Sequence, residues 1–296
     1  MMWLPAAFAS AVIFGIGGFL LKVGSHKNYP GASMLLGLYT AGSIVFLGAL
    51  LTGGSIVLNS GVLAFALLIG LGSYYGNSFL VRAYDTGPAC LTSPLMSLNI
   101  LLVIIMSALI YHEKISGWQY AGVACMMTAV SLLGANFSNT LIKSRMWALF
   151  VVLAILFIFM REGGLKIAHE AGMNNINVLF FGYLFAGALA IRKLLKDNRG
   201  QPRLPLLEEA GMGGAMVINT HRPAFLLGAA IGLFSATGMG LLAYAIARGP
   251  ASVIVPIFSA RNFVAVILLV VFFKEKLSLL QWAAVGLLIT GILLIS

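Results

Sequence analysis

Two places in this sequence put charged side chains inside apolar stretches, where such groups can do chemistry. Arg261 lies about ten residues into a long apolar run, and Asn262 follows it. An arginine at the centre of a membrane costs at least ~2.5–3.5 kcal/mol unless it faces water, a partner or a ligand. The position predicts a cavity cation that pairs with a substrate carboxylate or phosphate. A structural ion pair and a snorkelling side chain are the alternatives.

The second place is the adjacent pair Arg161 and Glu162. Only fifteen residues separate Arg145 from Arg161. A helix needs about 20 apolar residues to cross the hydrocarbon, so the pair lies inside the bilayer or at its edge. Glu162 could bind and release a proton and so couple proton movement to transport. It could equally be the counter-ion of Arg261 or Arg161, and the sequence leaves both open.

Uncharged polar side chains within apolar stretches complete the candidate substrate site. They are Asn77, Asn99, Tyr39, Tyr74, Tyr183 and Tyr244. An asparagine at mid-membrane is expected to face protein or a cavity, because lipid cannot hydrogen-bond its amide. A buried tyrosine is explained more readily by a hydrogen bond between helices than by contact with a ligand.

Two prolines are candidate hinges. Pro94 and Pro256 each lie a few residues into an apolar stretch. Proline removes a backbone donor and opens the helix one turn earlier. The carbonyl groups freed in this way can line a cavity, or the kink can simply shape the packing. The sequence does not separate these two uses.

The composition assigns the chain to the integral membrane proteins. Of its 296 residues, 60% are hydrophobic and 9% are charged, against about 25% charged residues in soluble domains. The apolar stretches are continuous rather than alternating, which predicts helices of roughly 20 residues each. Ten of them fill nearly the whole length, at about 3–23, 32–51, 61–84, 89–111, 117–135, 146–168, 177–191, 223–247, 251–273 and 279–295.

Several classes of function are disfavoured by the same composition. The net charge of +10 comes from basic residues in short loops beside the apolar stretches, where positive charge orients a membrane protein. We therefore expect no nucleic-acid partner. The sequence has no GxxxxGK[ST] nucleotide loop and no cluster with metal-ligand spacing. Cys90 and Cys125 are interpreted as small apolar residues. The expected protein is not an enzyme and uses no cofactor and no metal.

The chain contains one pattern twice. In the first two predicted helices of each copy, a shift of 144 positions places Tyr39 on Tyr183. In the later part of each copy, a shift of 162 positions places Gly87-Pro88-Ala89 on Gly249-Pro250-Ala251. Each copy holds five of the predicted helices. Because five is an odd number, the second copy must lie upside down relative to the first, as in many secondary transporters. The predicted fold is therefore all-α, with ten transmembrane helices in two inverted five-helix repeats.

The repeats resemble a known family. Each has Gly-Pro-Ala before its fourth helix, and each has Glu-Lys-[Ile/Leu]-Ser-x-x-Gln before its fifth, at Glu113 and at Glu275. This pattern is similar to the EamA type of the drug/metabolite transporter superfamily. The resemblance implies that helices one to four and six to nine surround a central cavity, with the fifth and tenth at the periphery. The expected repeats cover residues 1–137 and 146–296, with a linker at 138–145 and a long polar loop at 192–222.

Two arguments about orientation disagree. The loops after predicted helices one, three, five, seven and nine all lie on one side of the membrane. Thirteen Lys and Arg residues lie in or near these loops, against four on the opposite side. Cytoplasmic loops carry such an excess, which would place both termini outside. The resemblance instead implies termini in the cytoplasm. The charge bias favours the first alternative.

These observations predict a secondary active transporter that works by alternating access. The expected substrate is a small polar metabolite, an amino acid or related zwitterion, moved outward across the inner membrane of a bacterium or archaeon. Proton-coupled uptake of a sugar or neutral solute is one alternative, and a non-transporting scaffold or partner subunit is another. Expected partners are the substrate and membrane lipid. Protons as the coupling ion and a homodimer stay open.

Overall fold

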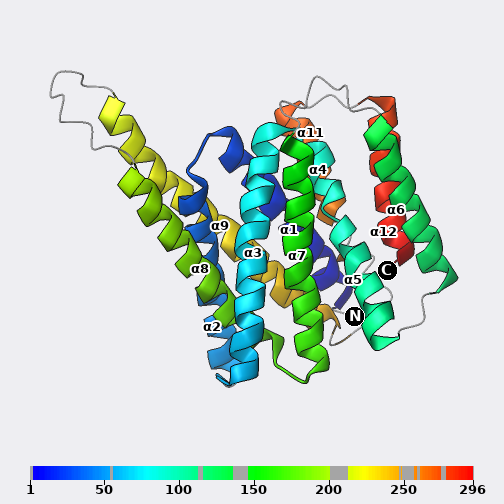
Figure 1. The fold of residues 1–296 in the computed structure, drawn as a ribbon, viewed down its shortest axis with the longest axis horizontal. Helices are drawn as coiled ribbons and strands as arrows, with labels where there is room; N and C mark the ends of the chain where they lie inside the picture. Colours follow the sequence, from blue (N-terminus) through cyan, green and yellow to red (C-terminus); the bar gives the residue numbers. More distant parts are fainter. Residues whose placement is uncertain are drawn as a thin grey trace.

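The computed structural model describes residues 3–53, 56–112, 116–135, 146–200, 213–246, 248, 257–258, 261–274 and 278–295. Within these ranges every regular element is an α-helix (Figure 1). The helices are α1 (Trp3–His26), α2 (Gly31–Gly53), α3 (Ser60–Thr86), α4 (Ala89–Leu95), α5 (Leu98–Tyr111), α6 (Gly117–Ala135), α7 (Met146–Glu170), α8 (Asn175–Gly200), α9 (Gly213–Ile246), α11 (Arg261–Phe273) and α12 (Leu279–Ile295).

Six helices in the described part of the chain are long and apolar enough to cross a membrane. They lie in α1, α2, α3, α7, α8 and α9, which are the first three predicted helices of each repeat. Shorter apolar helices occur at Val264–Phe273 and Trp282–Leu294. The all-helical membrane class is therefore confirmed. The count of ten stays a prediction, because the remaining stretches form shorter helices or extend beyond the described residues.

The predicted fourth helix is broken where proline interrupts it. Pro94 lies inside α4, which ends at Leu95, and α5 begins at Leu98. Proline has no amide hydrogen with which to continue the ladder. At the break the amide of Ser97 donates to the carbonyl of Pro94, at 3.0 Å, so the turn is tightened to a three-residue spacing. The corresponding proline of the second half, Pro256, lies outside the described residues.

Glycines let helices of the two halves approach closely. A Cβ on Gly70 of α3 would lie 2.7 Å from the carbonyl oxygen of Gly182 on α8. A Cβ on Gly232 of α9 would overlap the carbonyl of Leu38 on α2. The shifts of 162 and 144 positions convert the first contact into the second. Small residues are the usual means of close helix contact in membranes, where lipid removes the hydrophobic drive.

The arrangement of helices is also symmetric under exchange of the two halves. Helix α3 packs against α7 and α8, and α9 packs against α1 and α2. Likewise α1 contacts α11, and α7 contacts α5. Helices α6 and α12 pair with each other at one side of the bundle, on the right in Figure 1. The pairwise contacts therefore follow the order expected of two related halves.

Replacing Gly228 with alanine is expected to destabilise the bundle. A Cβ there would overlap the backbone carbonyl of Met34, and backbone cannot move aside as a side chain can. Overpacking of this kind typically costs about 1–3 kcal/mol. The matched control is Gly240→Ala on the same helix, where a Cβ would meet nothing within 4 Å. Thermal unfolding of the purified variants in detergent measures both. Equal melting temperatures for the two variants would show that the α2–α9 contact is looser than the structure indicates.

Candidate functional site

A central cavity of about 220 Å³ lies between the two halves. Helices α1, α3, α7 and α9 contribute to its wall, together with the α4–α5 break and the start of α11. Its charged lining residues are Arg161, Glu162 and Arg261. Its other polar lining residues are Asn77, Tyr84, Ser93, Ser97, Asn99, Tyr183 and Ser235. Six of the predicted site residues therefore meet in one space: Asn77, Asn99, Arg161, Glu162, Tyr183 and Arg261.

Arg161 and Glu162 form an ion pair on the cavity wall. Arg161 Nη2 donates to Glu162 Oε1 at 2.5 Å, and the two side chains are 19% and 31% exposed. The Nε of Arg161 is buried and has no hydrogen-bond partner within the described part of the chain. Glu162 is thus the counter-ion of its neighbour, and Arg161 keeps a donor that it does not use.

Arg261 is held by aromatic rings rather than by a carboxylate. Its guanidinium carbon lies 4.2 Å from the ring centroid of Phe258 and 5.6 Å from that of Phe14. Such stacking stabilises a cation while leaving the guanidinium N–H groups at its edge available for other partners. No described carboxylate lies within ion-pair distance of Arg261. Among the residues that the structure describes, the cavity therefore contains two guanidinium groups and one carboxylate.

A network of amide and phenol groups lies beside these charges. The amide nitrogen of Asn77 donates to the hydroxyl of Tyr39 at 3.0 Å. The rings of Tyr39 and Tyr183 meet edge to face, with centroids 5.4 Å apart. Tyr39 is fully buried and does not line the cavity, whereas Tyr183 does. Tyr39 therefore positions the Asn77 amide, which is the interhelical role expected of a buried tyrosine.

The two repeats contribute differently to the cavity. The shift of 144 positions places Gly17 and Gly18 on Arg161 and Glu162, and all four line the cavity. A Cβ on Gly17 or Gly18 would have no neighbour closer than 3.7 Å, so these glycines leave space. Asn99 corresponds to Arg261 under the shift of 162. Of the described lining residues, those from the second half thus carry the charge, and those from the first half provide space and amide groups.

Some predicted residues lie elsewhere. Tyr74 lines a different cavity, and Tyr244 is 37% exposed with its ring 3.9 Å from the guanidinium carbon of Arg248. The backbone of Asn262 belongs to α11, but its side chain and Pro256 lie outside the described residues. Sequence reasoning passed over Ser93 and Ser97. Both serines lie close to Pro94, where the helix is expected to open, and this position could have indicated that they line a cavity.

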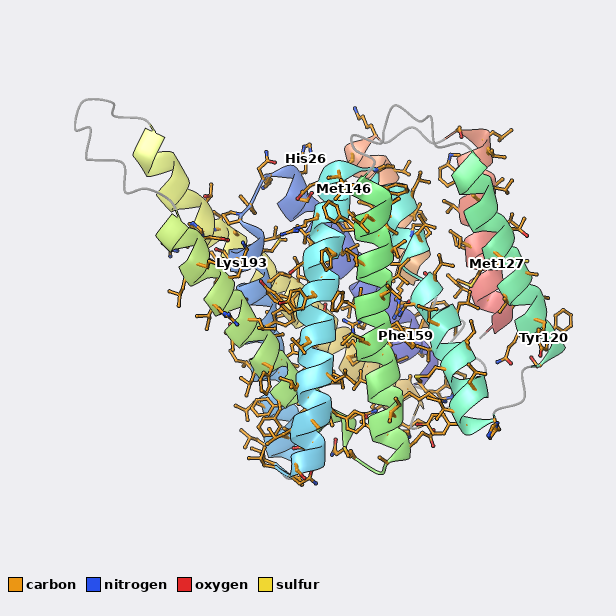
Figure 2. All side chains as sticks on the ribbon, in the orientation of Figure 1. His26, Tyr120, Met127, Met146, Phe159 and Lys193 are labelled. Atoms are coloured by element: carbon orange, nitrogen blue, oxygen red, sulfur yellow. The ribbon has the colours of Figure 1, made fainter. Side chains whose placement is uncertain are left out.

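Side chains of α1 and α3 bond to one another at the end of the bundle where these two helices finish. The ammonium of Lys22 donates to the carbonyl of Tyr84 at 2.6 Å, and the hydroxyl of Ser25 donates to the carboxylate of Asp85. Lys22 is buried, and Tyr84 lines the cavity. We call the contacts made by Lys22, Ser25, Tyr84 and Asp85 the α1–α3 latch. Figure 2 labels His26 and Met146 near this end of the bundle.

The latch lies at the basic end of the protein, named for the charges that gather there. The Lys and Arg residues at this end whose side chains the structure describes are Lys22, Lys27, Arg82, Arg192, Lys193, Lys196, Arg222 and Lys274. Those described at the opposite end are Lys166 and Arg248. The predicted one-sided distribution of charge therefore appears in the fold, among the residues that the structure describes.

Comparison with known proteins places this architecture in a family. The sequence profile of the EamA-like transporter family matches residues 1–135 and again residues 142–296. A solved crystal structure resembles the chain with a TM-score of 0.60 and 18% identity, over 99% of this chain and 95% of the other. At that identity the likeness shows the fold alone. No curated protein sequence matches the chain. Because the family profile covers both halves, this multi-pass membrane protein belongs to the EamA-like transporter family, within the drug/metabolite transporter superfamily.

Proposed function

We propose that this protein is a secondary transporter of a small metabolite carrying a carboxylate, an amino acid or related zwitterion. The observation that carries the proposal is the charge of the central cavity, two arginines against one glutamate. Arg261 is stacked on rings and binds the carboxylate with its free N–H groups. The Arg161–Glu162 pair, the Asn77 and Asn99 amides and the Tyr183 ring contact the rest of the molecule.

Alternating access between two inverted repeats is the mechanism that we propose. Its support is the exchange symmetry of the helix contacts, with α3 on α7 and α8 and α9 on α1 and α2. In this scheme α4 and α5 count as one broken span, and ten spans form repeats at residues 1–137 and 146–296. Transporters of this kind rock one half against the other around a site at mid-membrane. The α1–α3 latch would then open and close once in each cycle.

Cross-linking the latch tests the mechanism. Ser25→Cys and Asp85→Cys are combined in a background with Cys90→Ala and Cys125→Ala, and a short reducible thiol cross-linker joins them. Substrate exchange in liposomes is expected to fall to background and to return after reduction, because the bridged ends of α1 and α3 cannot separate. Each single-cysteine variant, treated with the same reagent, is the control. Full exchange by the bridged protein would refute alternating access at this end.

Ligand panels test the substrate class. Amino acids and other small carboxylates are expected to raise the melting temperature of the purified protein, because a ligand that binds only the folded state stabilises it. Stabilisation by sugars, with none by amino acids, would favour proton-coupled uptake of a neutral solute. The amides and hydroxyls of Asn77, Asn99, Ser93 and Ser97 support that second candidate, since such groups recognise hydroxyls.

The proposal extends to the direction and place of transport. We propose export across the inner membrane of a bacterium or archaeon, by transport alone rather than by catalysis. The basic end would face the cytoplasm by the positive-inside rule, and both termini would then lie outside. A non-transporting scaffold is disfavoured, because such a protein would be expected to have a core filled by side chains and no polar cavity between its halves. Accessibility of Lys27→Cys to a membrane-impermeant thiol reagent distinguishes the two orientations.

A further inference from the structure

A second and larger cavity, of about 570 Å³, lies at the basic end between α8 and the α2–α3 pair. Figure 1 shows α8 and α9 leaning away from α3 toward this end of the bundle. Tyr29 borders the cavity from the turn before α2, and Gly31 borders it from the first residue of α2. Arg82 and Asp85 border it from the last turns of α3. The far wall is the charged end of α8, from Leu189 to Asp197.

The charge of this wedge-shaped cavity is positive. Four basic residues line it, Arg82, Arg192, Lys193 and Lys196, against the two carboxylates of Asp85 and Asp197, which is a net charge of +2. Both carboxylates already have partners. Asp197 accepts from Lys193 at 2.7 Å, and Asp85 accepts from Ser25.

The remaining basic residues are available for a ligand. Arg82 stacks on Phe79 and Phe150, at 5.8 and 5.9 Å. Arg192 and Lys196 lie one helical turn apart on α8, and both border the cavity. Neither makes an ion pair with any carboxylate that the structure describes. Three uncommitted cations around one space form a site for an anion.

This wedge is separate from the central cavity. Helix α3 divides the two, with Asn77, Leu80 and Tyr84 on the central side and Ser78, Arg82 and Asp85 on the other. No described residue lines both spaces. A ligand in the wedge therefore contacts the outer face of α3 and the inner face of α8, away from Arg261 and Glu162.

The polarity of the wedge changes with depth. Its charged residues belong to the ends of α3 and α8, where the apolar part of α8 gives way to Arg192. Deeper along α3 the wall is Val81 and Phe79, with Leu189 of α8 and Leu35 of α2 beside them, and Tyr75 and Tyr74 lie farthest from the charged end. A phospholipid likewise places its charged phosphate before its apolar acyl chains. A small soluble phosphate would leave the apolar part of this space unused.

We propose that the wedge binds the phosphate headgroup of an anionic phospholipid. Arg192 and Lys196 contact the phosphate together with Arg82. The upper acyl chains lie along Leu189, Leu35 and Phe79. Because the lipid touches both α8 and α3, it would bridge the second repeat to the first.

The test uses full-length protein that has been stripped of lipid and kept in a neutral detergent. Its melting temperature is measured as lipid is added. Phosphatidylglycerol is expected to stabilise the protein more than phosphatidylcholine. Glycerol phosphate, as the free headgroup, is expected to have little effect at the same concentration. In Arg192→Gln/Lys196→Gln the phosphatidylglycerol needed for half of the effect is expected to rise roughly 30-fold, as two basic side chains at a membrane surface would produce.

The control variant is Arg222→Gln/Lys274→Gln, which removes two exposed charges from the same end outside the wedge. Its response to lipid is expected to match that of the unmodified protein. Ala32→Trp fills the wedge without changing its charge and is expected to abolish the phosphatidylglycerol effect. Three results would overturn the proposal: an equal effect of phosphatidylcholine, an equal effect of glycerol phosphate, or an equal loss in the control variant. The readout is binding, so it stands whether or not the transport proposal holds.

Discussion

Arg261→Gln is expected to abolish transport while the protein still inserts and folds. Arg261 has no described carboxylate partner and is held by Phe258 and Phe14. Its removal therefore leaves no orphaned counter-ion. Loss of one partner from a buried, hydrogen-bonded charge pair costs about 2–5 kcal/mol. Substrate affinity should therefore fall by about 30-fold or more.

Counterflow in liposomes measures the transport rate of Arg261→Gln, and thermal unfolding measures its stability. Arg248→Gln is the matched control, because Arg248 also stacks on an aromatic ring, that of Tyr244, but lies outside the central cavity. The control should transport normally. Normal counterflow by Arg261→Gln would remove this residue from the site and the carboxylate from the proposed substrate.

The second large effect concerns the Arg161–Glu162 pair. Either Arg161→Ala or Glu162→Gln alone is expected to destabilise the protein by about 3–5 kcal/mol, because each leaves an uncompensated charge in a partly buried site. The double variant Arg161→Ala/Glu162→Gln should recover much of that loss, since removing both charges of a buried pair leaves neither charge uncompensated. The first repeat has uncharged residues at the two corresponding positions, Gly17 and Gly18, so the fold accommodates a repeat without this ion pair.

Melting temperatures of the two single variants and the double variant form the double-mutant cycle that measures this coupling. The cycle also decides the role of Glu162. An unchanged melting temperature in Glu162→Gln, with exchange intact and accumulation driven by a pH gradient lost, would contradict the ion-pair assignment. That result would identify Glu162 as the group that carries the coupling proton.

Much of the fold was predictable because it depends on patterns that are local or repeated. Continuous apolar stretches identify the helices, since lipid offers backbone groups no hydrogen bonds. The internal shifts of 162 and 144 positions relate the halves, and the same shifts relate the observed contacts of Gly70 and Gly232. Arg261 and Asn99 were predicted because polar groups inside apolar runs are costly and must face a cavity or a partner.

The sequence by itself determined the membrane class, the family, the repeated pattern and the three charged residues, Arg161, Glu162 and Arg261, that the structure describes in the cavity. Only the tertiary structure decided which polar groups meet. It pairs Glu162 with Arg161, directs Tyr39 to Asn77 and places Tyr74 on the outer side of α3. The physical reason is helix rotation. Each residue turns by about 100° along a helix, so neighbours in sequence can face different spaces, and packing against the other half selects the face.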